Sequence, residues 1–344
     1  MIYPRYPTGK KELLRWLGDP SQIAGVKRYI CTEGGAHGLE AIDVNSGSGL
    51  VFTVLPGRGM DIAHASYRGI PLSYIAKPGL TSASLFEYGN SAWLRSFAGG
   101  LISTCGLSNV GNPCDENLDG LGPQHYALHG RIGAMPAEQV SATADWDEKG
   151  YVFRVSGLVR EAQLRGEYFS MRRTITCRLG ESRFTLEDSI CNEDGLPHPL
   201  MIMYHINFGY PLLSPSASLT LPESECFCDD PVSEANKHTA CSFTEPEAGV
   251  PEQLFFHKLT GRGKNVATLF NNDLQVGVSV GFDSSRLPFL TEWKMMGERD
   301  YVVGIEPGNC LPRGRVYHRE KGWLEMLEPG QEVRQMLEIG VISD

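Results

Sequence analysis

Residues 168–192 decide the fold class of this chain, because they read YFSMRRTITC, RLGES and RFTLEDSICN in succession. The two outer runs, Tyr168 to Cys177 and Arg183 to Asn192, are rich in residues that favour strands, and the run between them has the length of a hairpin turn. Apolar and polar residues alternate over the first half of the second run, as they do in an antiparallel strand with two different faces. This stretch predicts an antiparallel β-hairpin.

The chain continues this pattern on both sides of the hairpin. Further runs with the period of a strand are Val26 to Thr32, Gly38 to Asn45, Leu50 to Leu55, Asp61 to Ser66, Ile70 to Ile75, Tyr151 to Arg160, Ala267 to Phe270, Leu274 to Val280, Tyr301 to Glu306 and Val333 to Val341. Residues 210–265 are rich in proline, and we expect long loops with short strands there. The regular alternation of strands and helices in a doubly wound fold is missing. The chain is therefore predicted to be all-β, as one large antiparallel β-sandwich.

We expect the sandwich to occupy most of the chain. Residues 1–25 are predicted to form an N-terminal extension, in which a leucine stripe indicates a short helix over residues 8–17. Residues 26–344 are predicted to form a single β-sandwich domain, since they contain no low-complexity linker and no repeat of fixed short period.

The composition excludes several classes of protein. The chain has 344 residues, of which 41% are hydrophobic and 21% charged, so a large core is possible. A net charge of -10 argues against nucleic acid or an anionic membrane as the main partner. No segment approaches the roughly 18 uninterrupted apolar residues of a membrane span. We expect a small molecule as the partner, and a monomer or homodimer.

The cysteines and the N-terminus indicate the compartment. The nine cysteines are odd in number and follow no framework of disulfide spacings, so we interpret them as reduced thiols. Residues 1–7 lack the apolar core of a signal peptide. Both observations predict a cytoplasmic protein.

Two ionisable residues stand out because each lies in an apolar run with the composition of a strand. His205 lies in MIMYHINF, residues 201–208, and Glu306 lies in YVVGIEPGN, residues 301–309. A histidine and a carboxylate held on rigid strands make a competent acid and base pair. Alternatively, His205 is a buried histidine bonded to a carbonyl, and Glu306 is a strand-end carboxylate paired with an arginine.

Three further motifs offer polar or aromatic groups. The run PGRGMDI could present Arg58 and Asp61 to a ligand, or form a tight turn with an internal ion pair. In LHGRIG, His129 and Arg131 lie on one side if the segment is extended, where they could hold hydroxyl groups. Trp293 could stack on a flat apolar face of a ligand or belong to the core.

Two groups of residues contain the side chains that bind zinc, but we expect neither to form a zinc site. His125 and His129 have the spacing of a helical pair, but Pro123 and the absence of helical periodicity argue against a helix there. The second group, whose spacing matches no common zinc finger, is Cys226, Cys228, His238 and Cys241. We therefore expect no metal.

Taken in order, these motifs resemble the galactose mutarotase-like superfamily, which contains aldose 1-epimerases and hexose-phosphate mutarotases. The resemblance covers roughly residues 26–341 and rests on PGRGMD at 56–61, LHGR at 128–131 and GIEPGN at 304–309. It is strongest to a bacterial branch of aldose 1-epimerase-like proteins that is mostly uncharacterised. The fold that it implies is a large antiparallel β-sandwich, the galactose mutarotase-like supersandwich, with the site on a concave face.

The resemblance also implies a function and roles for individual residues. By it, the protein is an isomerase that interconverts the α and β anomers of a free sugar, without a cofactor. His205 matches the family's catalytic acid, Glu306 its catalytic base, and His129 a histidine that contacts the substrate. We expect these three residues around one open pocket, with Arg58 and Arg131 as sources of a guanidinium.

Departures from the family pattern affect the sugar more than the chemistry. The usual Asn-Arg after the early glycine-rich strand is replaced by Ser108-Asn109. The acidic sugar-binding residue of the galactose enzymes has no clear match, and Asp283 and Glu292 are candidates for it. Asp61 and Trp293 are further candidates for contacts with the sugar. A non-catalytic carbohydrate-binding protein on the same fold is the main alternative, and it would not need both His205 and Glu306.

Overall fold

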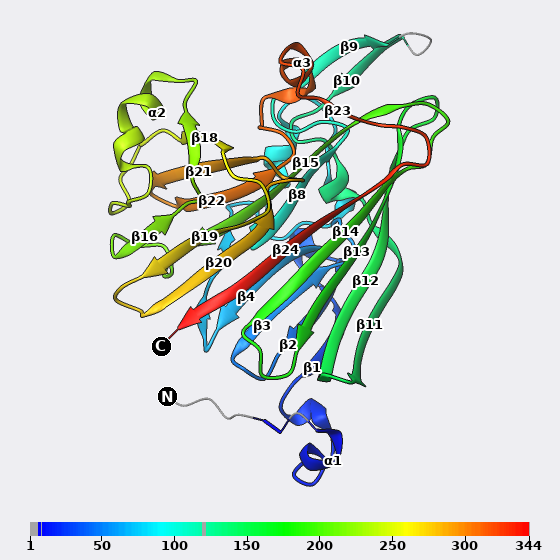
Figure 1. The fold of residues 1–344 in the computed structure, drawn as a ribbon, viewed down its shortest axis with the longest axis vertical. Helices are drawn as coiled ribbons and strands as arrows, with labels where there is room; N and C mark the ends of the chain where they lie inside the picture. The colour runs from blue at the N-terminus through cyan, green and yellow to red at the C-terminus, as the bar shows by residue number, and fades with distance from the viewer. Residues whose placement is uncertain (1–5, 8, 119–121, 344) are drawn as a thin grey trace.

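The computed structural model describes residues 6–7, 9–118 and 122–343. Residues 1–5 and 8 of the predicted extension lie outside the described residues. Two antiparallel sheets, of 12 and 8 strands, face each other and make up most of the molecule (Figure 1). The prediction of a large antiparallel β-sandwich is confirmed.

The larger sheet contains the strands that carry the candidate site. In spatial order its strands are β1 (Gly25–Ile30), β2 (Glu40–Asn45), β3 (Leu50–Leu55), β4 (Asp61–Tyr67), β8 (Ile102–Leu107), β15 (His198–Gly209), β22 (Asp300–Gly308), β21 (Phe289–Gly297), β18 (Gln253–Leu259) and β17 (Ser224–Phe227), with β5 (Ile70–Pro71) beside β4 and β23 (Glu325–Leu327) beside β15.

The smaller sheet packs against one face of the larger sheet. Its strands in spatial order are β11 (Ala137–Asp147), β12 (Gly150–Ala162), β13 (Tyr168–Arg178), β14 (Arg183–Asn192), β24 (Glu332–Ser343), β20 (Val276–Asp283), β19 (Lys264–Asn271) and β16 (Ala217–Thr220). Two strand pairs stand apart from both sheets, β9 (Cys114–Leu118) with β10 (Gly122–Tyr126) and β6 (Tyr74–Ile75) with β7 (Gly99–Gly100).

Helices are short and lie outside the sandwich. They are α1 (Lys10–Leu13), α2 (Pro231–Asn236), α3 (Gly314–Glu320), and the 3-10 turns η1 (Pro20–Gln22), η2 (Gly34–Ala36), η3 (Ala83–Leu85), η4 (Ala92–Arg95), η5 (Ile132–Ala134) and η6 (Lys237–Thr239). The predicted helix over residues 8–17 is present only as the single turn of α1. Within the described residues, no helix has both the length and the apolar character needed to cross a membrane.

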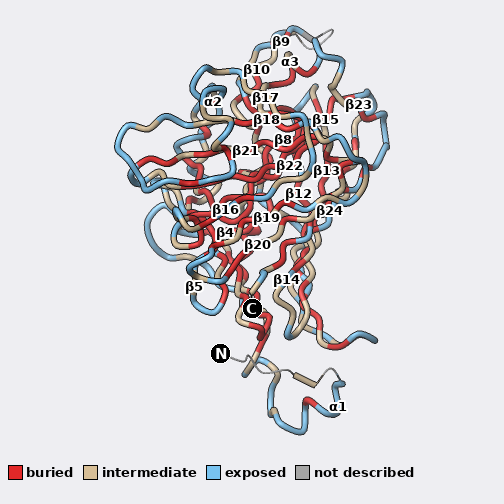
Figure 2. The backbone as a smooth tube through the Cα atoms, turned by 60° about the vertical axis from the view of Figure 1, so that its left-hand side comes forward, coloured by how far each residue is buried: buried red, intermediate tan, exposed pale blue. Residues whose placement is uncertain are grey.

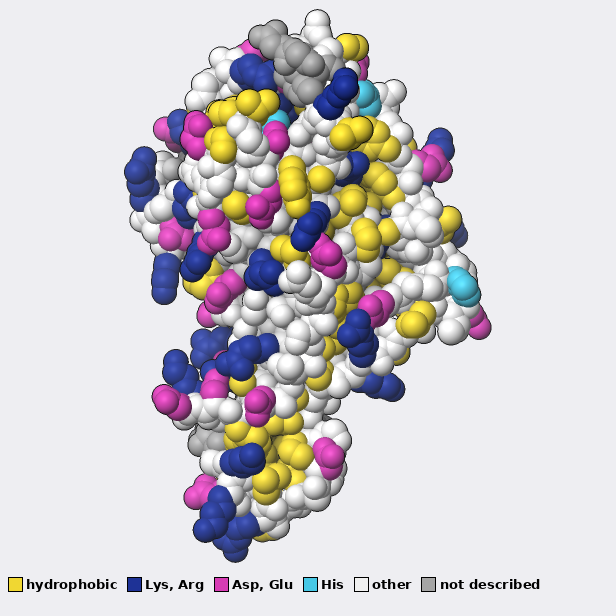
Figure 3. All heavy atoms as spheres, turned by 90° about the vertical axis from the view of Figure 1, so that its right-hand side faces the viewer, with side chains coloured by type: hydrophobic (Ala, Val, Ile, Leu, Met, Phe, Trp, Pro, Cys, Tyr) yellow, Lys and Arg dark blue, Asp and Glu magenta, His cyan; other side chains and the backbone are white. Residues whose placement is uncertain are grey.

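The N-terminal lobe around α1 projects from one end of the sandwich. Figure 3 shows hydrophobic side chains gathered on this lobe and in a band above it, with acidic and basic side chains interspersed around them. Trp16 is 80% exposed there, whereas Leu13 is buried. Only one side of this short helix therefore contributes to the packed interior.

The predicted hairpin forms β13 and β14, which pair from Phe169 with Asn192 to Cys177 with Phe184. Phe184, like its neighbours on the same face, points into the core between the sheets, where its ring lies 4.4 Å from that of Phe52 on β3. Asp188 lies on this inward face although it is charged. The break in the apolar alternation at Asp188 thus marks a buried polar group.

An arginine fixes that buried carboxylate and ties the two sheets together. Arg173 on β13 donates to both oxygens of Asp188, at 2.8 and 2.7 Å, and to Asp61 on β4 at 2.9 Å. Tyr204 on β15 donates to Asp188 at 2.8 Å, and Thr104 on β8 donates to Asp61 at 2.6 Å. Burial by itself would lower the pKa of Arg173, but Asp188 and Asp61 raise this pKa above its ordinary value. The network is fully paired and crosses from one sheet to the other.

Replacing Arg173 with Ala is expected to lower the free energy of unfolding by roughly 3–5 kcal/mol, because two carboxylates are left in the core without their cation. The matched control is Arg172→Ala, since Arg172 is the exposed neighbour on the same strand, and we expect a change of at most about 0.5 kcal/mol there. Urea denaturation measures both values. Equal losses for the two variants would contradict the role of the network.

Candidate active site

Strand β15 carries the site and is buried along its whole length (Figure 2). Side chains alternate between the two faces of a strand. Ile202 and Tyr204 point into the core between the sheets. Met203 belongs to a separate apolar cluster on the other face of the larger sheet. His205 follows on this outer face, where apolar side chains from loops cover it.

Glu306 reaches the same face from the neighbouring strand. Ile206 on β15 pairs with Ile305 on β22, so His205 and Glu306 are neighbours across the two strands. The distance between His205 Nε2 and Glu306 Oε1 is 3.1 Å, and the two side chains are 6% and 2% exposed. Oε1 nevertheless accepts no well-aligned hydrogen bond. The two groups are adjacent without being locked to each other.

Asn207 orients the imidazole of His205. The distance between His205 Nδ1 and Asn207 Oδ1 is 2.6 Å. The amide nitrogen of Asn207 donates to the carbonyl oxygens of Gly100, at 3.1 Å, and of His205, at 2.9 Å. The amide oxygen is therefore the atom that faces the ring, and His205 is held from behind while Nε2 faces Glu306.

Burial shifts the acid–base properties of both groups toward their neutral forms. It lowers the pKa of His205 to about 4, although the hydrogen bond with Asn207 opposes the shift. It raises the pKa of Glu306 well above its ordinary value, and the charge of Glu252 adds to this. Sites that transfer protons often contain a histidine and a carboxyl group in contact, both with shifted pKa values.

Gly304 leaves room for the carboxylate of Glu306. A Cβ atom added at Gly304 would lie 2.5 Å from Glu306 Oε1 and 3.3 Å from Trp293 Cβ. The Glu306 side chain therefore folds back along β22 and fills the space that a side chain at position 304 would occupy. The glycine in the run GIEPGN is a spatial requirement of the site.

His129 lies beside the pair, in a turn, so the segment is not extended at this point. Its backbone φ of 58° and that of Gly130, 66°, are both left-handed, and a Cβ atom on Gly130 would lie 2.4 Å from the carbonyl oxygen of Gly106. The His129 ring lies 6.1 Å from the His205 ring. Its Nδ1 accepts a hydrogen bond from the Gly111 N–H at 3.3 Å. Burial, with a smaller effect of His205, lowers the pKa of His129 to about 3.

Three aromatic rings close over these groups. Trp93 stacks on Phe97 with 4.5 Å between ring centroids and lies 4.6 Å from His129. Phe97 lies 5.2 Å from His205, and Trp293 on β21 lies 5.0 Å from His205. Trp93 and Phe97 belong to residues 76–98, which connect β6 to β7 and which we call the covering segment. The rings give the acid–base pair an apolar ceiling.

Arg58 fixes the covering segment at two points. Its guanidinium donates to the carbonyl oxygen and hydroxyl of Thr81, at 3.2 and 2.8 Å, and to the carbonyl oxygen of Ser96, at 3.1 Å. A further bond reaches the carbonyl oxygen of Gly133 at 3.0 Å. We predicted a guanidinium for the substrate, whereas the structure uses Arg58 to hold the cover.

Three other predicted contacts lie away from the pair. Asp61 is part of the buried network with Arg173. Arg131 donates to the carbonyl oxygen of Ala162. Glu292 is fully buried on the face of β21 opposite to Trp293, with His257 Nε2 4.0 Å away, and burial raises its pKa to about 7. We leave these three residues and Arg58 out of the candidate site.

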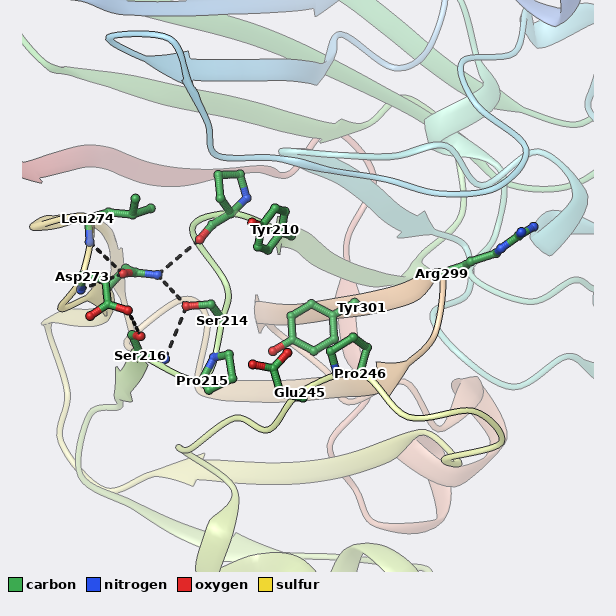
Figure 4. A pocket seen from close by; sticks show the side chains of 12 residues that line it. Tyr210, Ser214, Pro215, Ser216, Glu245, Pro246, Asp273, Leu274, Arg299 and Tyr301 are labelled. Atoms are coloured by element: carbon green, nitrogen blue, oxygen red, sulfur yellow. Dashed lines mark hydrogen bonds between the residues drawn. The ribbon is translucent and has the colours of Figure 1, made fainter.

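The side chains of the pair are buried, at 6% and 2% exposure, whereas His129 and Trp293 beside them are half-buried. None of the five cavities described in residues 6–7, 9–118 and 122–343 is lined by His129, His205 or Glu306. The largest of them, about 520 Å³, lies around Tyr210 and Tyr301, and its Asn271 amide is occupied by the carbonyl oxygen of Pro211 and the hydroxyl of Ser214 (Figure 4). The described residues also contain no group of three or more His, Cys, Asp or Glu arranged to hold a metal ion.

Sequence reasoning missed Trp93, Phe97 and Asn207. Asn207 stands two residues after His205, on the same face of a strand, and this spacing was available as a signal. Trp93 and Phe97 lie in an irregular segment without strand or helix periodicity. Their only signal was the presence of large aromatic residues in a loop, which does not indicate what they cover.

Comparisons with known proteins agree with this fold. A family model described as "Domain of unknown function (DUF4432)" matches residues 36–341. A crystal structure from Klebsiella pneumoniae, of a protein provisionally named as an aldose 1-epimerase, has a TM-score of 0.85 and 26% identity, over 93% of this chain and 83% of that chain. A search of the curated proteins finds no match.

Two other solved structures share the fold at lower identity. A galactose mutarotase-like protein from Clostridium acetobutylicum has a TM-score of 0.67 and 14% identity, over 94% of this chain and all of that chain (100%). A galactose 1-epimerase from Lactobacillus acidophilus has a TM-score of 0.60 and 13% identity, over 93% and 100%. The predicted resemblance to the galactose mutarotase-like fold is confirmed.

Replacing Glu306 with Gln is expected to stabilise the fold at neutral and alkaline pH. Because burial raises the pKa of Glu306, the folded state keeps a proton that the unfolded chain releases once the pH exceeds the ordinary carboxyl range. Stability is then lost as the pH rises through the folded-state pKa, and an uncharged amide of similar shape escapes this loss. Thermal unfolding of both proteins from about pH 5 to about pH 9 checks the prediction. A difference in Tm that does not grow with pH would contradict it.

Proposed function

This chain belongs to the DUF4432 family, and from its fold and candidate site we propose that it is an aldose 1-epimerase-like isomerase, which interconverts the α and β anomers of a free sugar. The contact between His205 and Glu306 on the outer face of the larger sheet carries this proposal. The Klebsiella pneumoniae protein that shares 26% identity carries the corresponding provisional name, which supports the same reading.

The reaction requires two proton transfers at neighbouring oxygens. One proton is added to the ring oxygen and one is removed from the anomeric hydroxyl, so that the ring opens. Rotation about the C1–C2 bond and reversal of both transfers give the other anomer. Because both oxygens are bonded to C1, the donor and the acceptor have to be close to each other. The 3.1 Å between His205 and Glu306 meets this requirement.

The aromatic ceiling fits a sugar as the ligand. The faces of sugars that carry C–H groups are apolar, and they stack on rings such as Trp93, Phe97 and Trp293. His129 Nδ1 accepts from a backbone N–H, so its Nε2 carries the hydrogen and can donate to a sugar hydroxyl. Since the pair is almost fully buried, Trp93 and Phe97 have to move to admit the sugar.

The proposal extends to compartment and partners. All nine cysteines are free thiols, which supports a reducing compartment such as the cytoplasm. The partner that we propose is a small sugar. A carbohydrate-binding protein without activity would use the same rings and His129, but it would gain nothing from a buried carboxyl in contact with a histidine.

Glu306→Gln and His205→Asn are each expected to lower the rate of anomer exchange by roughly 10²–10⁴-fold, which is the usual contribution of one acid or base. The double variant should lose little more than either single variant, because the two groups act as one unit. The rate is measured by exchange NMR or polarimetry on freshly dissolved sugars, with galactose and glucose first, then deoxy sugars, pentoses, ketoses and sugar phosphates.

The chain contains a matched control for these substitutions. His257 and Glu292 form a second buried histidine–carboxyl pair on the opposite face of the same sheet, 4.0 Å apart. His257→Asn and Glu292→Gln should leave the exchange rate at the wild-type level. If the wild type binds a sugar but accelerates none, the protein is a binding module; if Glu306→Gln is fully active, the site is elsewhere.

Gly304→Ala is expected to lower the exchange rate at least tenfold, and to cost some stability because the added Cβ also lies 3.3 Å from Trp293 Cβ and Cε3. The added Cβ would meet the far end of the flexible Glu306 side chain at 2.5 Å, so the carboxylate moves away from His205 while the backbone stays in place. A displacement of about 1 Å at a catalytic group costs up to roughly 10²-fold. Comparing kcat with Tm for this variant checks the prediction, and a drop in Tm without a drop in kcat would oppose it.

A further inference from the structure

We propose that the cavity around Tyr210 and Tyr301 is a second sugar-binding site, in which a neutral sugar packs on the two tyrosine rings and donates hydroxyl groups to Glu245. We call this cavity the tyrosine cleft. It goes beyond the proposed function, because it lies apart from His205 and Glu306 and requires no catalysis by them.

Four connections between strands build the tyrosine cleft. Its walls come from residues within 210–216, 245–246, 271–274 and 299–301. The first and last of these segments adjoin strands of the larger sheet, and the third joins β19 to β20 of the smaller sheet, so both sheets support the cleft. Its volume of about 520 Å³ is within the range of roughly 300–1,000 Å³ that is usual for small-molecule sites.

Two tyrosine rings supply the flat apolar surfaces of the cleft. Tyr210 is 75% exposed although it directly follows the buried strand β15, so its ring contributes little to the core. The Tyr301 hydroxyl donates to the carbonyl oxygen of Thr244 at 2.6 Å, which holds the Tyr301 ring in place. The C–H face of a sugar can pack on such rings.

Most polar groups of the cleft already have partners within the protein. The Asn271 amide donates to the carbonyl oxygen of Leu212 and to the hydroxyl of Ser214, both at 2.9 Å, and the hydroxyl of Ser216 donates to Asp273. The carboxylate of Glu245 differs from these groups, because it makes no hydrogen bond and no ion pair with any residue that the structure describes.

Glu245 is an acceptor beside one of the two rings. Figure 4 shows its carboxylate next to Tyr301, and burial, together with the charge of Glu245, raises the pKa of Tyr301 to about 12. An ionised carboxylate has two oxygens that only accept, so two neighbouring hydroxyls of one sugar can both donate to it. A sugar offers hydroxyls at its edge and C–H groups on its face, which matches a carboxylate next to a ring.

The charges and donors of the cleft select among the possible ligands. Glu245 and Asp273 are both acidic, and the guanidinium of Arg299 extends away from the two tyrosines (Figure 4). An acidic sugar or a sugar phosphate would therefore meet negative charge. A proline-rich peptide could pack on the tyrosines, but proline has no N–H to donate to Glu245. A neutral sugar satisfies both the rings and the carboxylate.

The tyrosine cleft and the candidate active site lie at different points of the same two strands. Tyr301 and Glu306 both belong to β22, and Tyr210 follows the strand that carries His205. From position 301 to position 306 an extended strand advances roughly 17 Å. One sugar ring therefore cannot contact both sites, and the cleft can bind a sugar while the covering segment stays in place.

The first test observes the tyrosine rings directly in the wild-type protein. Protein labelled with ¹³C at its tyrosines is titrated with galactose, glucose, maltotriose and cellotriose, and the ring signals are assigned by their loss in Tyr210→Ala and Tyr301→Phe. We expect at least one of these sugars to shift both signals. If none of them does, or if decaproline shifts both signals and no sugar does, the proposal is wrong.

The same titration tests the charge of the ligand. Glucose 6-phosphate and galacturonate should bind at least about tenfold more weakly than the best neutral sugar, because like charges repel. Anionic sugars that bind as tightly as the neutral ones would contradict the role of Glu245.

The second test removes one ring or the free carboxylate. Tyr210→Ala and Glu245→Ala should each raise the Kd read from the Tyr301 signal at least about tenfold, the usual effect of losing a packed ring or a hydrogen bond to a charged group. Trp16→Ala, at another exposed aromatic residue, and Glu247→Ala, at an exposed neighbour outside the cleft, should leave this Kd unchanged. An unchanged Kd in Glu245→Ala would overturn the proposal.

These measurements separate the tyrosine cleft from the proposed function. If the wild type exchanges no anomers, the proposed function fails while the tyrosine signals still report binding. If exchange is fast and neither tyrosine signal responds to any of the four neutral sugars, the epimerase stands and the second site does not.

Discussion

The burial of β15 on both faces is the constraint on which the rest of this structure depends. A strand between two packed layers has no water on either side, so each polar side chain on it needs a partner within the protein. Tyr204 finds one in Asp188, through the arginine network between the sheets. His205 finds one in Asn207, and its second nitrogen is left facing Glu306. Along this strand, a residue that ties the two sheets together, Tyr204, is followed by a candidate catalytic residue, His205.

The site is assembled from segments that are distant in the chain. Antiparallel pairing of β15 with β22 places Glu306 beside His205, and a turn that needs two left-handed residues presents His129. Arg58 then fixes the segment that carries Trp93 and Phe97 over them. Each part is held by backbone geometry or by a charged group bonded to backbone carbonyls. The candidate catalytic residues themselves do not hold other parts of the site in place, apart from the bond between His205 and Asn207.

Much of the fold could be predicted because periodicity and turn length are local properties of the sequence. The hairpin of β13 and β14 was expected with nearly its observed bounds, and His205 and Glu306 stood out as ionisable groups in apolar strands. Arg58 and Asp61 were placed at the substrate because a sequence shows that a charge is present, but not which groups of the fold bond to it. Glu292 and Trp293 are adjacent in sequence, yet their strand sends them to opposite faces. The aromatic cover depends on tertiary contacts of an irregular segment, for which no periodic signal exists.

The covering segment limits the rate at which the proposed reaction can proceed. Sugars change anomer in water without help, so any catalyst of the reaction competes with its own solvent. Under the proposed function, a pair that is 2–6% exposed meets a sugar only when the covering segment moves aside. The rate at which the segment opens is an upper limit on the turnover rate. The rate of the spontaneous reaction is the value that a useful catalyst has to exceed. For the proposed isomerase, the bonds from Arg58 to Thr81 and Ser96 would therefore limit the rate as much as the acid and the base do, since a cover held too firmly would be slower than the uncatalysed reaction in water.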